Sequence, residues 1–272
     1  MRSIPTQVQA VLDAYISFFN EQFPNMLEGL YIHGSIALDA YVNNSSDIDF
    51  IAVLNRLFTQ DEMLLLSELH SKIANQYKYP ELDGVYIKWE ELGKLESNDK
   101  DNVYYNNGKI RFGPYFNFNP ITWSVSKSDG LTVIGPEVQT LEFAASKDDL
   151  VTYVMENMKN YWTPRIQKIE GSIQNLLNLS TKEIDTEIEW SVLGILRQYY
   201  TLKEHKIISK HGAGKYALQH ISEEWHNIIL EAINIRTGVK ETLFESEEQR
   251  IETFLAFARY LLNECKQKWF ER

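Results

Sequence analysis

The stretch YIHGSIALDAYVNNSSDIDFIAVL, residues 31–54, joins two apolar runs through a polar turn. The first run ends at Gly34-Ser35, and the second begins with Asp47 and Asp49, which are two positions apart. On a β-strand such side chains point to the same face, where like charges repel unless a cation lies between them. Carboxylate oxygens favour Mg²⁺, which bridges nucleotide phosphates. The stretch therefore predicts a metal site at Asp47 and Asp49.

Gly34 and Ser35 have the properties of a phosphate-binding turn. Glycine lets the backbone turn sharply and approach a ligand closely, and serine adds a hydroxyl and an N–H group at the start of a helix. We therefore expect both residues to bind nucleotide phosphates. The alternative is that Ser35 and the two aspartates are ordinary surface residues of a turn-rich segment.

The first half of the sequence alternates predicted helices and strands. Apolar residues recur at helical spacing from Pro5 to Phe23, and Thr59 and Glu62 form a capping-box pattern ahead of a further helix. Strands are predicted over residues 26–34, 47–54 and 82–89. The segment over residues 96–120, which is rich in Asn, Asp, Gly and Tyr, is predicted to be an irregular loop.

The second half has a different character. From residue 148 onward the apolar spacing is helical, in long segments over residues 150–177, 186–202, 222–235 and 246–269. We place a domain boundary near residue 145. The sequence thus predicts a mixed α/β domain, 1–145, followed by an almost entirely helical domain, 146–272.

The composition narrows the possible partners. The chain has 272 residues and a net charge of −11, from 38 acidic and 27 basic residues. This charge weighs against an extended nucleic-acid surface and suits a cationic small molecule, although an acidic balance also simply favours solubility. No apolar run approaches the roughly 20 residues of a membrane helix. Cys265 is the only cysteine, so we expect a cytoplasmic protein without an intrachain disulfide.

The motif as a whole resembles the signature of the nucleotidyltransferase superfamily, to which polymerase-β-like enzymes belong. Its parts are Gly34-Ser35, a gap of eleven residues, and Asp47-x-Asp49. The resemblance implies a third carboxylate on a neighbouring strand, which completes the metal site or acts as general base. The candidates are Glu81 and Asp83. We choose Asp83, because Leu82-Asp83 stands where antibiotic adenylyltransferases have Leu-Glu before an apolar run.

The chain is also similar to aminoglycoside nucleotidyltransferases of the streptomycin/spectinomycin adenylyltransferase type. The resemblance implies an α+β nucleotidyltransferase domain with a small mixed sheet, residues 1–145, and an all-α helical-bundle domain, residues 146–272. In that family a helical Arg and a Lys thirteen residues later contact the ATP phosphates. Arg197 and Lys210 have this spacing, although a solvated helix face is the alternative for each.

The acceptor site is implied by the same resemblance. An acidic residue ten positions before the Arg binds the aminoglycoside in the family, and Glu187 stands there. The alternative is an exposed residue favoured by the helix dipole. The streptomycin-recognising Trp and Asp of the family are Asn178 and Glu183 here, and Trp162 and Trp190 are expected in the core. These differences favour spectinomycin over streptomycin.

The resulting hypothesis is Mg²⁺-dependent transfer of AMP from ATP to a hydroxyl group of an aminoglycoside or aminocyclitol. We expect a monomer that binds the nucleotide and a cationic antibiotic, without a nucleic-acid or membrane partner. Another acceptor, such as a lincosamide, a protein or an RNA end, is the first alternative. An inactive nucleotide-binding regulatory module is the second, and clustered carboxylates at residues 47, 49 and 83 argue against it.

Overall fold

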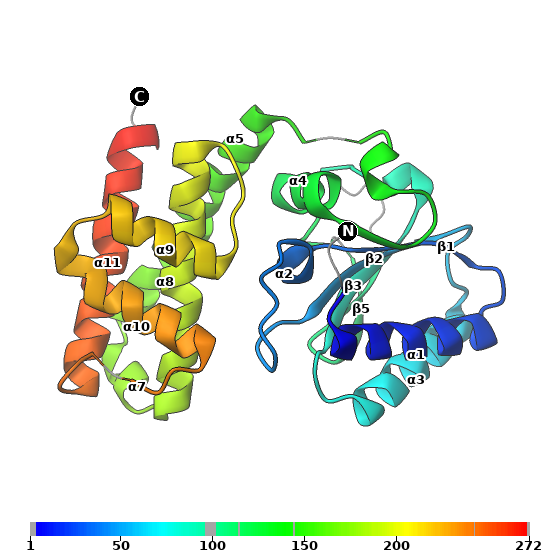
Figure 1. Ribbon diagram of the computed structural model, residues 1–272, viewed down its shortest axis with the longest axis horizontal. Helices are drawn as coiled ribbons and strands as arrows, with labels where there is room; N and C mark the ends of the chain where they lie inside the picture. Colours follow the sequence, from blue (N-terminus) through cyan, green and yellow to red (C-terminus); the bar gives the residue numbers. More distant parts are fainter. Residues whose placement is uncertain (1–3, 96–101, 114, 144, 242, 271–272) are drawn as a thin grey trace. The chain divides into compact units, whose positions relative to one another are not determined.

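The computed structural model describes residues 4–95, 102–113, 115–143, 145–241 and 243–270. The chain divides into two compact units, Met1–Ala145 and Ser146–Arg272. The first unit contains the described β-strands, and the second is helical (Figure 1). Among the described residues no helix is both long and apolar enough to span a bilayer.

The first unit is built on a six-stranded mixed sheet with the order β5-β4-β3-β2-β1-β6. Strands β2 and β3 pair in parallel, and the other neighbours are antiparallel. The predicted α+β fold class is confirmed by this sheet and by the helical second unit. The strands are β1 (Leu27–Ile32), β2 (Ile48–Leu54), β3 (Leu82–Lys88), β4 (Val103–Asn106), β5 (Lys109–Phe112) and β6 (Leu131–Ile134).

The two faces of the sheet are covered by different elements. Helices α1 (Thr6–Gln22) and α3 (Gln60–Gln76) lie together on one face (Figure 1). The side chains on that face share a buried core with alternate residues of β2 and β3, among them Phe50 and Tyr86. Trp123 of helix α4 (Pro120–Asp129) packs in a second core on the other face, with the intervening residues of β2 and β3. Because side chains alternate along a strand, each position of β2 and β3 is committed to one face.

The prediction of an irregular loop over residues 96–120 is wrong for residues 103–112. These residues form a β-hairpin, in which β4 pairs with β3 and β5 pairs with β4. The turn is Asn107-Gly108, with φ of 49° and 71°. Both φ values are positive, as a two-residue hairpin turn of this hand requires, and Asn-Gly is the sequence that favours it. The Asn and Gly residues of this segment mark the turn of the hairpin, and their abundance does not mean that strands are absent.

The second unit is organised around helix α8 (Thr181–Glu204), which contacts α5, α9, α10 and α11. Its first turn is closed by a capping box, in which the side chains of Ser180 and Glu183 accept hydrogen bonds from each other's backbone N–H groups. The other helices are α5 (Lys147–Asn157), α6 (Thr163–Glu170), α7 (Ile173–Leu177), α9 (Lys210–His220), α10 (His226–Thr237) and α11 (Glu247–Cys265). Cys265 is buried at the end of α11.

Two helical predictions need correction. The segment over residues 150–177 is not one helix, because a π-helical turn, Met158–Trp162, joins α5 to α6 and a break after Glu170 separates α7. Helix α8 begins at Thr181 rather than at 186, because the capping box at Ser180 starts it earlier. Helix α9 was not predicted, since a segment with two closely spaced glycines, Gly212 and Gly214, is more typical of a loop.

A buried arginine ties three helices of this unit together. Arg250 of α11 has a side chain that is 5% exposed and forms ion pairs with Asp185 of α8, Glu231 of α10 and Glu247. Glu231 is itself only 3% exposed, and its Oε1 atom lies 2.8 Å from Arg250 Nε. Removing the arginine would therefore leave a buried carboxylate without its cation, which is a strongly destabilising change.

We predict that Arg250→Met lowers the free energy of unfolding of the helical unit by about 3–5 kcal/mol. The matched control is Arg259→Met on the same helix, because Arg259 is 62% exposed and its ion pair with Glu170 lies at the surface. Such a pair contributes about 0–1 kcal/mol. Urea unfolding of both variants, followed by circular dichroism, measures the difference. Equal losses in the two variants would contradict the stabilising role of Arg250.

Candidate functional site

The carboxylates predicted to bind metal meet on the parallel strands β2 and β3. The register of these strands places Asp49 directly opposite Asp83, at the usual strand separation of about 4.8 Å. Asp49 shares its face with Ile51 and Val53, whose side chains lie in the core that contains Trp123. Asp83 is on the same face by the same alternation. Two of the three predicted carboxylates are thus neighbours across the ladder.

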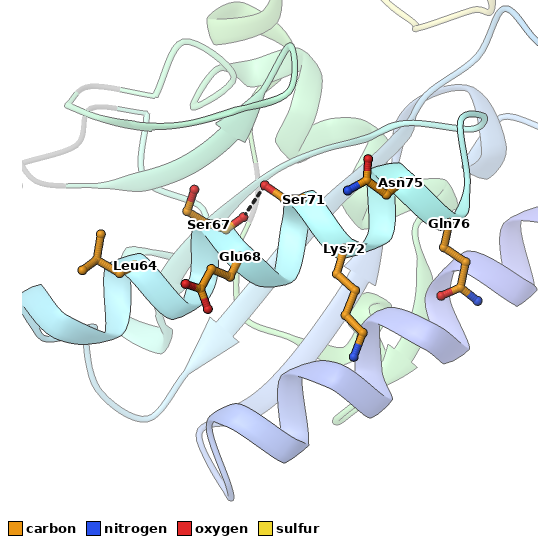
Figure 2. Close-up of a pocket in the computed structure, with 7 residues that line it drawn as sticks. All are labelled: Leu64, Ser67, Glu68, Ser71, Lys72, Asn75 and Gln76. Carbon is orange, nitrogen blue, oxygen red and sulfur yellow. Dashed lines mark hydrogen bonds between the residues drawn. The ribbon is translucent and has the colours of Figure 1, made fainter.

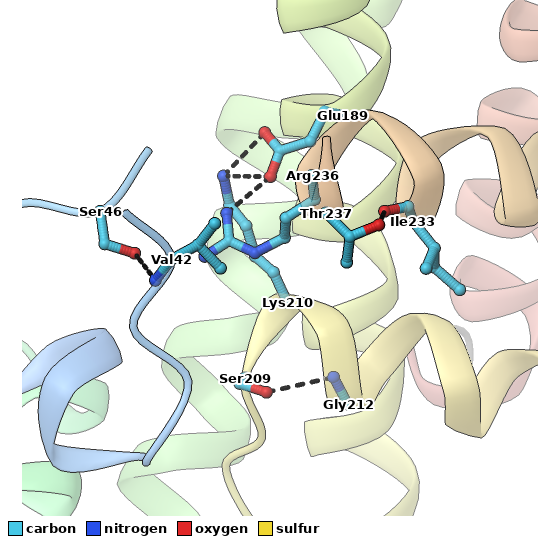
Figure 3. Close-up of polar contacts among 9 residues, drawn as sticks. All are labelled: Val42, Ser46, Glu189, Ser209, Lys210, Gly212, Ile233, Arg236 and Thr237. Carbon is cyan, nitrogen blue, oxygen red and sulfur yellow. Dashed lines mark hydrogen bonds and ion pairs between the residues drawn. The ribbon is translucent and has the colours of Figure 1, made fainter. Parts of the chain in front are cut away.

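Asp47 lies just before β2, at the end of a polar loop. It is exposed, whereas Ser46 beside it is buried. The Val42 N–H group donates a 3.0 Å hydrogen bond to the Ser46 hydroxyl, which closes this loop (Figure 3). The Asp47 carboxylate is close enough to Asp83 to raise its pKa. The loop therefore holds Asp47 within electrostatic reach of the strand pair.

Asp83 has the perturbed environment expected of a general base. Burial, followed by the Asp47 and Glu81 carboxylates, raises the pKa of Asp83 from 3.8 to about 6. Against this, the Asn106 side chain donates a 2.6 Å hydrogen bond from Nδ2 to Asp83 Oδ2, which favours the charged form. Glu81, the other candidate, is exposed and lies just before β3. The geometry favours Asp83, while the assignment of the base itself stays a prediction.

Two residues beside Asp83 were missed from the sequence, because both lie in the segment predicted as a loop. Asn106 is the last residue of β4, so the hairpin brings its amide to the Asp83 carboxylate. Tyr115 is buried near both aspartates, and burial, then Asp83 and to a lesser degree Asp49, raises its pKa well above the usual value. The Asn107-Gly108 turn was the signal that could have located Asn106. Nothing comparable in the sequence marked Tyr115.

Gly34 and Ser35 begin helix α2 (Gly34–Ala37) directly beside Asp49. Gly34 has a φ of +64°, and a Cβ atom there would lie 1.9 Å from Asp49 Oδ2. Glycine is thus required both by conformation and by space. The preceding residue, His33, donates its backbone N–H to the Asp49 carbonyl oxygen at 3.0 Å, and burial lowers the pKa of its ring to about 4. The Ser35 hydroxyl is buried and lacks a hydrogen-bond partner among the described residues.

The carboxylates at positions 47, 49 and 83 are chemically suited to bind a divalent cation. Asp83 Oδ1 is buried without a hydrogen-bond partner among the described residues, although Tyr115 is close enough to stabilise the charge. A cation would also offset the repulsion between Asp47 and Asp83. Within the described part of the chain, however, no three His, Cys, Asp or Glu residues are gathered closely enough to hold a metal ion. The metal roles of Asp47, Asp49 and Asp83 remain predictions.

In the second unit, the predicted phosphate-binding residues lie in one basic cluster. Lys210 is the first residue of α9, and its Nζ atom lies 3.2 and 3.1 Å from the two carboxylate oxygens of Glu189 (Figure 3). Arg236 of α10 donates to the same Glu189 at 2.8 Å. Arg197 donates from Nε to the Ile208 carbonyl oxygen at 3.1 Å, and its charge lowers the pKa of Lys210. Glu189 and Arg236 were not predicted from the sequence.

Glu187, the predicted acceptor-binding residue, is held by two partners. Its Oε2 atom lies 2.5 Å from Arg165 Nη2, and its Oε1 atom accepts a 2.6 Å hydrogen bond from the Ser191 hydroxyl. The Arg165 guanidinium lies 4.5 Å above the centre of the Trp190 ring. Glu187 is therefore not the simple exposed residue that the helix-dipole alternative describes. A cationic ligand at Glu187 would compete with Arg165.

The tryptophans near this carboxylate pack against each other. Trp162 is 5% exposed, and its ring centre lies 4.7 Å from that of Trp190. A Cβ atom at Gly194 would lie 2.6 Å from the Trp162 ring, so the helix approaches this ring closely. Trp162 is thus a core residue, as expected, whereas Trp190 is only half-buried. Asn178 follows α7 as its C-terminal cap, and Glu183 belongs to the capping box of α8.

Two hollows of the first unit lie apart from this chemistry. One runs along α3 and is lined by seven residues of that helix, where Ser71 donates to the Ser67 carbonyl oxygen (Figure 2). The other has a volume of about 310 Å³ and is lined by aromatic and apolar residues that include Tyr77 and Tyr105. Glu81, the alternative base, is one of the residues that line the second hollow, whereas none of the chosen site residues lines either hollow.

The comparison with known families matches most of the second unit. Residues 162–264, which include Glu187, Arg197 and Lys210, match the family described as aminoglycoside adenylyltransferase, C-terminal domain. The second unit is thus similar to the C-terminal domain of aminoglycoside adenylyltransferases, which supports a nucleotidyltransferase of that type. The resemblance predicted from the sequence is thereby confirmed. A comparison with curated proteins found no match.

The fold of the chain also has a counterpart among solved structures. It is similar to a spectinomycin adenyltransferase, AAD(9), from Enterococcus faecialis, whose crystal structure contains ATP and spectinomycin. The TM-score is 0.65 at 16% sequence identity, and the match covers 94% of this chain and 99% of the other. At this identity the similarity establishes the fold.

We predict that Asp83→Asn stabilises the metal-free protein at about pH 8 but not at about pH 4. Because the folded-state pKa of about 6 is above the ordinary 3.8, the stability contributed by Asp83 is full below pH 3.8 and is lost as the pH rises through 6. The asparagine has no such loss, so its advantage at the higher pH should be roughly 1–3 kcal/mol. Urea unfolding with a chelator present measures it.

The matched control for this titration is Glu81→Gln, which removes the exposed neighbouring carboxylate. It should change stability less than Asp83→Asn at the higher pH. If Asp83→Asn has the same effect at both pH values, the buried-carboxylate interpretation of Asp83 is wrong.

Proposed function

We propose that the chain transfers AMP from ATP to a hydroxyl group of an aminocyclitol or aminoglycoside and releases pyrophosphate. The observation that carries this proposal is the pairing of Asp49 with the half-buried Asp83 on parallel strands beside Gly34. Carboxylates that cluster in this way suit a metal–nucleotide complex and a proton acceptor. The family match over residues 162–264 supports an antibiotic as the acceptor.

In the proposed reaction Asp83 removes the proton from the acceptor hydroxyl. The hydroxyl oxygen then forms a bond to the α-phosphorus of ATP, and the bond from that phosphorus to the pyrophosphate oxygen breaks. A base with a pKa of about 6 is largely deprotonated at neutral pH yet still basic enough to accept the proton. Asn106 keeps the Asp83 carboxylate oriented through its 2.6 Å hydrogen bond.

The remaining predicted residues bind and orient the nucleotide. Asp47 and Asp49, with Asp83, would hold Mg²⁺, which neutralises phosphate charge when bound. Gly34 allows the backbone to come close to a phosphate, and the partnerless Ser35 hydroxyl is available to donate to one. Arg197 and Lys210 are proposed to bind the phosphates that leave as pyrophosphate.

The acceptor is proposed to bind through Glu187. A carboxylate suits the ammonium groups of an aminocyclitol through charge-assisted hydrogen bonds. We favour spectinomycin over streptomycin, because Asn178 occupies the position of the streptomycin-recognising Trp. The similarity in fold to an enzyme crystallised with ATP and spectinomycin supports this choice. A lincosamide, protein or RNA end as acceptor is the alternative.

We predict that Asp49→Asn and Asp83→Asn each lose pyrophosphate release from ATP in the presence of spectinomycin by roughly 10²-fold or more. Asp49→Asn removes a metal ligand and should weaken binding of Mg²⁺–ATP. Asp83→Asn should leave that binding intact if Asp83 acts only as the base, and should weaken it if Asp83 also holds the metal. Coupled pyrophosphate assays and ATP calorimetry separate the two effects. Near-normal turnover of Asp83→Asn together with a crippled Glu81→Gln would assign the base to Glu81 instead.

We predict that Glu187→Gln weakens spectinomycin binding by about tenfold to a hundredfold and spares ATP, because a charge-assisted hydrogen bond contributes roughly 1.5–3 kcal/mol. Arg165→Met should instead tighten spectinomycin binding, since it removes the cation that competes for Glu187. Calorimetric titration with spectinomycin, streptomycin and kanamycin measures both changes.

The control for the acceptor experiment is Glu183→Gln on the same helix, because glutamine preserves the capping box. It should bind spectinomycin as the wild-type chain does. If the wild-type chain binds none of the three antibiotics more tightly than about millimolar, the acceptor is of another class.

A further inference from the structure

One carboxylate in the second unit is shared by two cations from different helices. Glu189 of α8 accepts from Lys210 of α9 at 3.1 and 3.2 Å and from Arg236 of α10 at 2.8 Å (Figure 3). The side chains of Arg236, Glu189 and Lys210 are 6%, 11% and 21% exposed. Lys210 is therefore the most accessible member, and Arg236 is the most deeply buried.

The local helix structure does not favour a lysine at position 210. It is the first residue of α9, where the positive end of the helix dipole disfavours a cation. Ser209 already caps this helix, because its hydroxyl accepts a 3.1 Å hydrogen bond from the Gly212 N–H group. Helix stability alone would prefer an acidic residue at position 210. The lysine is thus kept at the N-terminus by its contact with Glu189 and is placed where an anion is favoured.

We propose that Glu189 is a positioning residue for phosphate recognition, which keeps the Lys210 ammonium group oriented and protonated. Arg236 weakens this effect, because it shares the negative charge of Glu189 with Lys210. This inference rests on the proposed role of Lys210 in binding ATP phosphates. Arg236 Nε is buried without a hydrogen-bond partner among the described residues, so Arg236 depends on Glu189 for its charge compensation.

The charges that face Lys210 predict opposite effects of the two neighbours. Burial lowers the pKa of Lys210, and Arg236 of α10 and Arg197 of α8 lower it further, whereas Glu189 of α8 raises it. Of these three charged neighbours, removing Glu189 leaves Arg236 and Arg197, both cations, near the ammonium group. Removing Arg236 leaves the whole carboxylate to Lys210. Electrostatics alone moves the pKa of Lys210 in opposite directions in these two variants, so the change in ATP affinity is what distinguishes a positioning role from a purely structural ion pair.

We predict that Glu189→Gln lowers the pKa of Lys210 by about one unit or more, whereas Arg236→Gln raises it. The measurement is a carbon-detected NMR titration of lysine side chains in the full chain without nucleotide, with the Lys210 signal assigned by its loss in Lys210→Arg. Glu183→Gln, on the same helix, should leave that signal unchanged. This readout does not depend on the proposed function.

ATP affinity supplies the second readout, measured by calorimetry with Mg²⁺–ATP. Glu189→Gln should weaken binding by about tenfold or more near pH 9 and by less near pH 7, because deprotonated Lys210 no longer attracts phosphate. Glu189→Asp, which retains the charge, should restore most of the binding at the higher pH. If Glu189→Gln alone fails to fold, the double variant Glu189→Gln/Arg236→Gln removes both buried charges and is compared with Arg236→Gln.

The outcomes separate this inference from the proposed function. An unchanged Lys210 titration in the Glu189 variants would overturn the positioning role, and so would a shifted titration without any change in ATP affinity. If Lys210→Met binds ATP as tightly as the wild-type chain, the phosphate role of Lys210 is wrong, and so is the positioning role of Glu189. Opposite titration shifts with a pH-dependent loss of ATP binding would support the inference.

Discussion

The repulsion between carboxylates on neighbouring parallel strands is the constraint around which the first unit is arranged. Asp49 and Asp83 face each other across the β2–β3 ladder, and Asp47 adds a third negative charge nearby. Burial makes this repulsion stronger, because a charged group loses its hydration. The surrounding residues compensate locally: Asn106 donates to Asp83, and Gly34 gives the Asp49 carboxylate room that no other residue would leave.

The second unit handles charge differently, by placing ion pairs around side chains that are buried between its helices. Arg250 gathers three acidic residues from three helices, and Glu189 gathers two basic residues from two. The first arrangement has an excess of negative charge around a single cation and connects the helices. The second has an excess of positive charge around a single carboxylate, and this excess is the basis of the phosphate-binding role proposed for Lys210. The same kind of contact thus serves packing in one place and, in the proposed function, ligand binding in the other.

The sequence predicted the parts of this molecule whose physical signals are local. The helix that begins after Thr59 follows from its capping box, and the strands that carry Asp49 and Asp83 follow from their apolar runs. The π-helical turn before α6 and the contacts of Glu189 and Arg236 could not be predicted. They depend on which helices pack together, and side chains 47 positions apart carry no local signal of their contact. The position of Glu187 was predictable, but its ion pair with Arg165 was not.

The hairpin of β4 and β5 couples the edge of the sheet to the chemistry of its centre. β5 is the outermost strand on its side, and its Lys109 and Arg111 place charges on an edge that could otherwise pair with another chain. The two-residue turn fixes the register of β4, and one inserted residue there would turn alternate side chains to the opposite face. The length of this turn would then decide whether Asn106 reaches Asp83. Insertions at an exposed hairpin tip are usually harmless, but here they would alter the basicity of the half-buried Asp83 carboxylate.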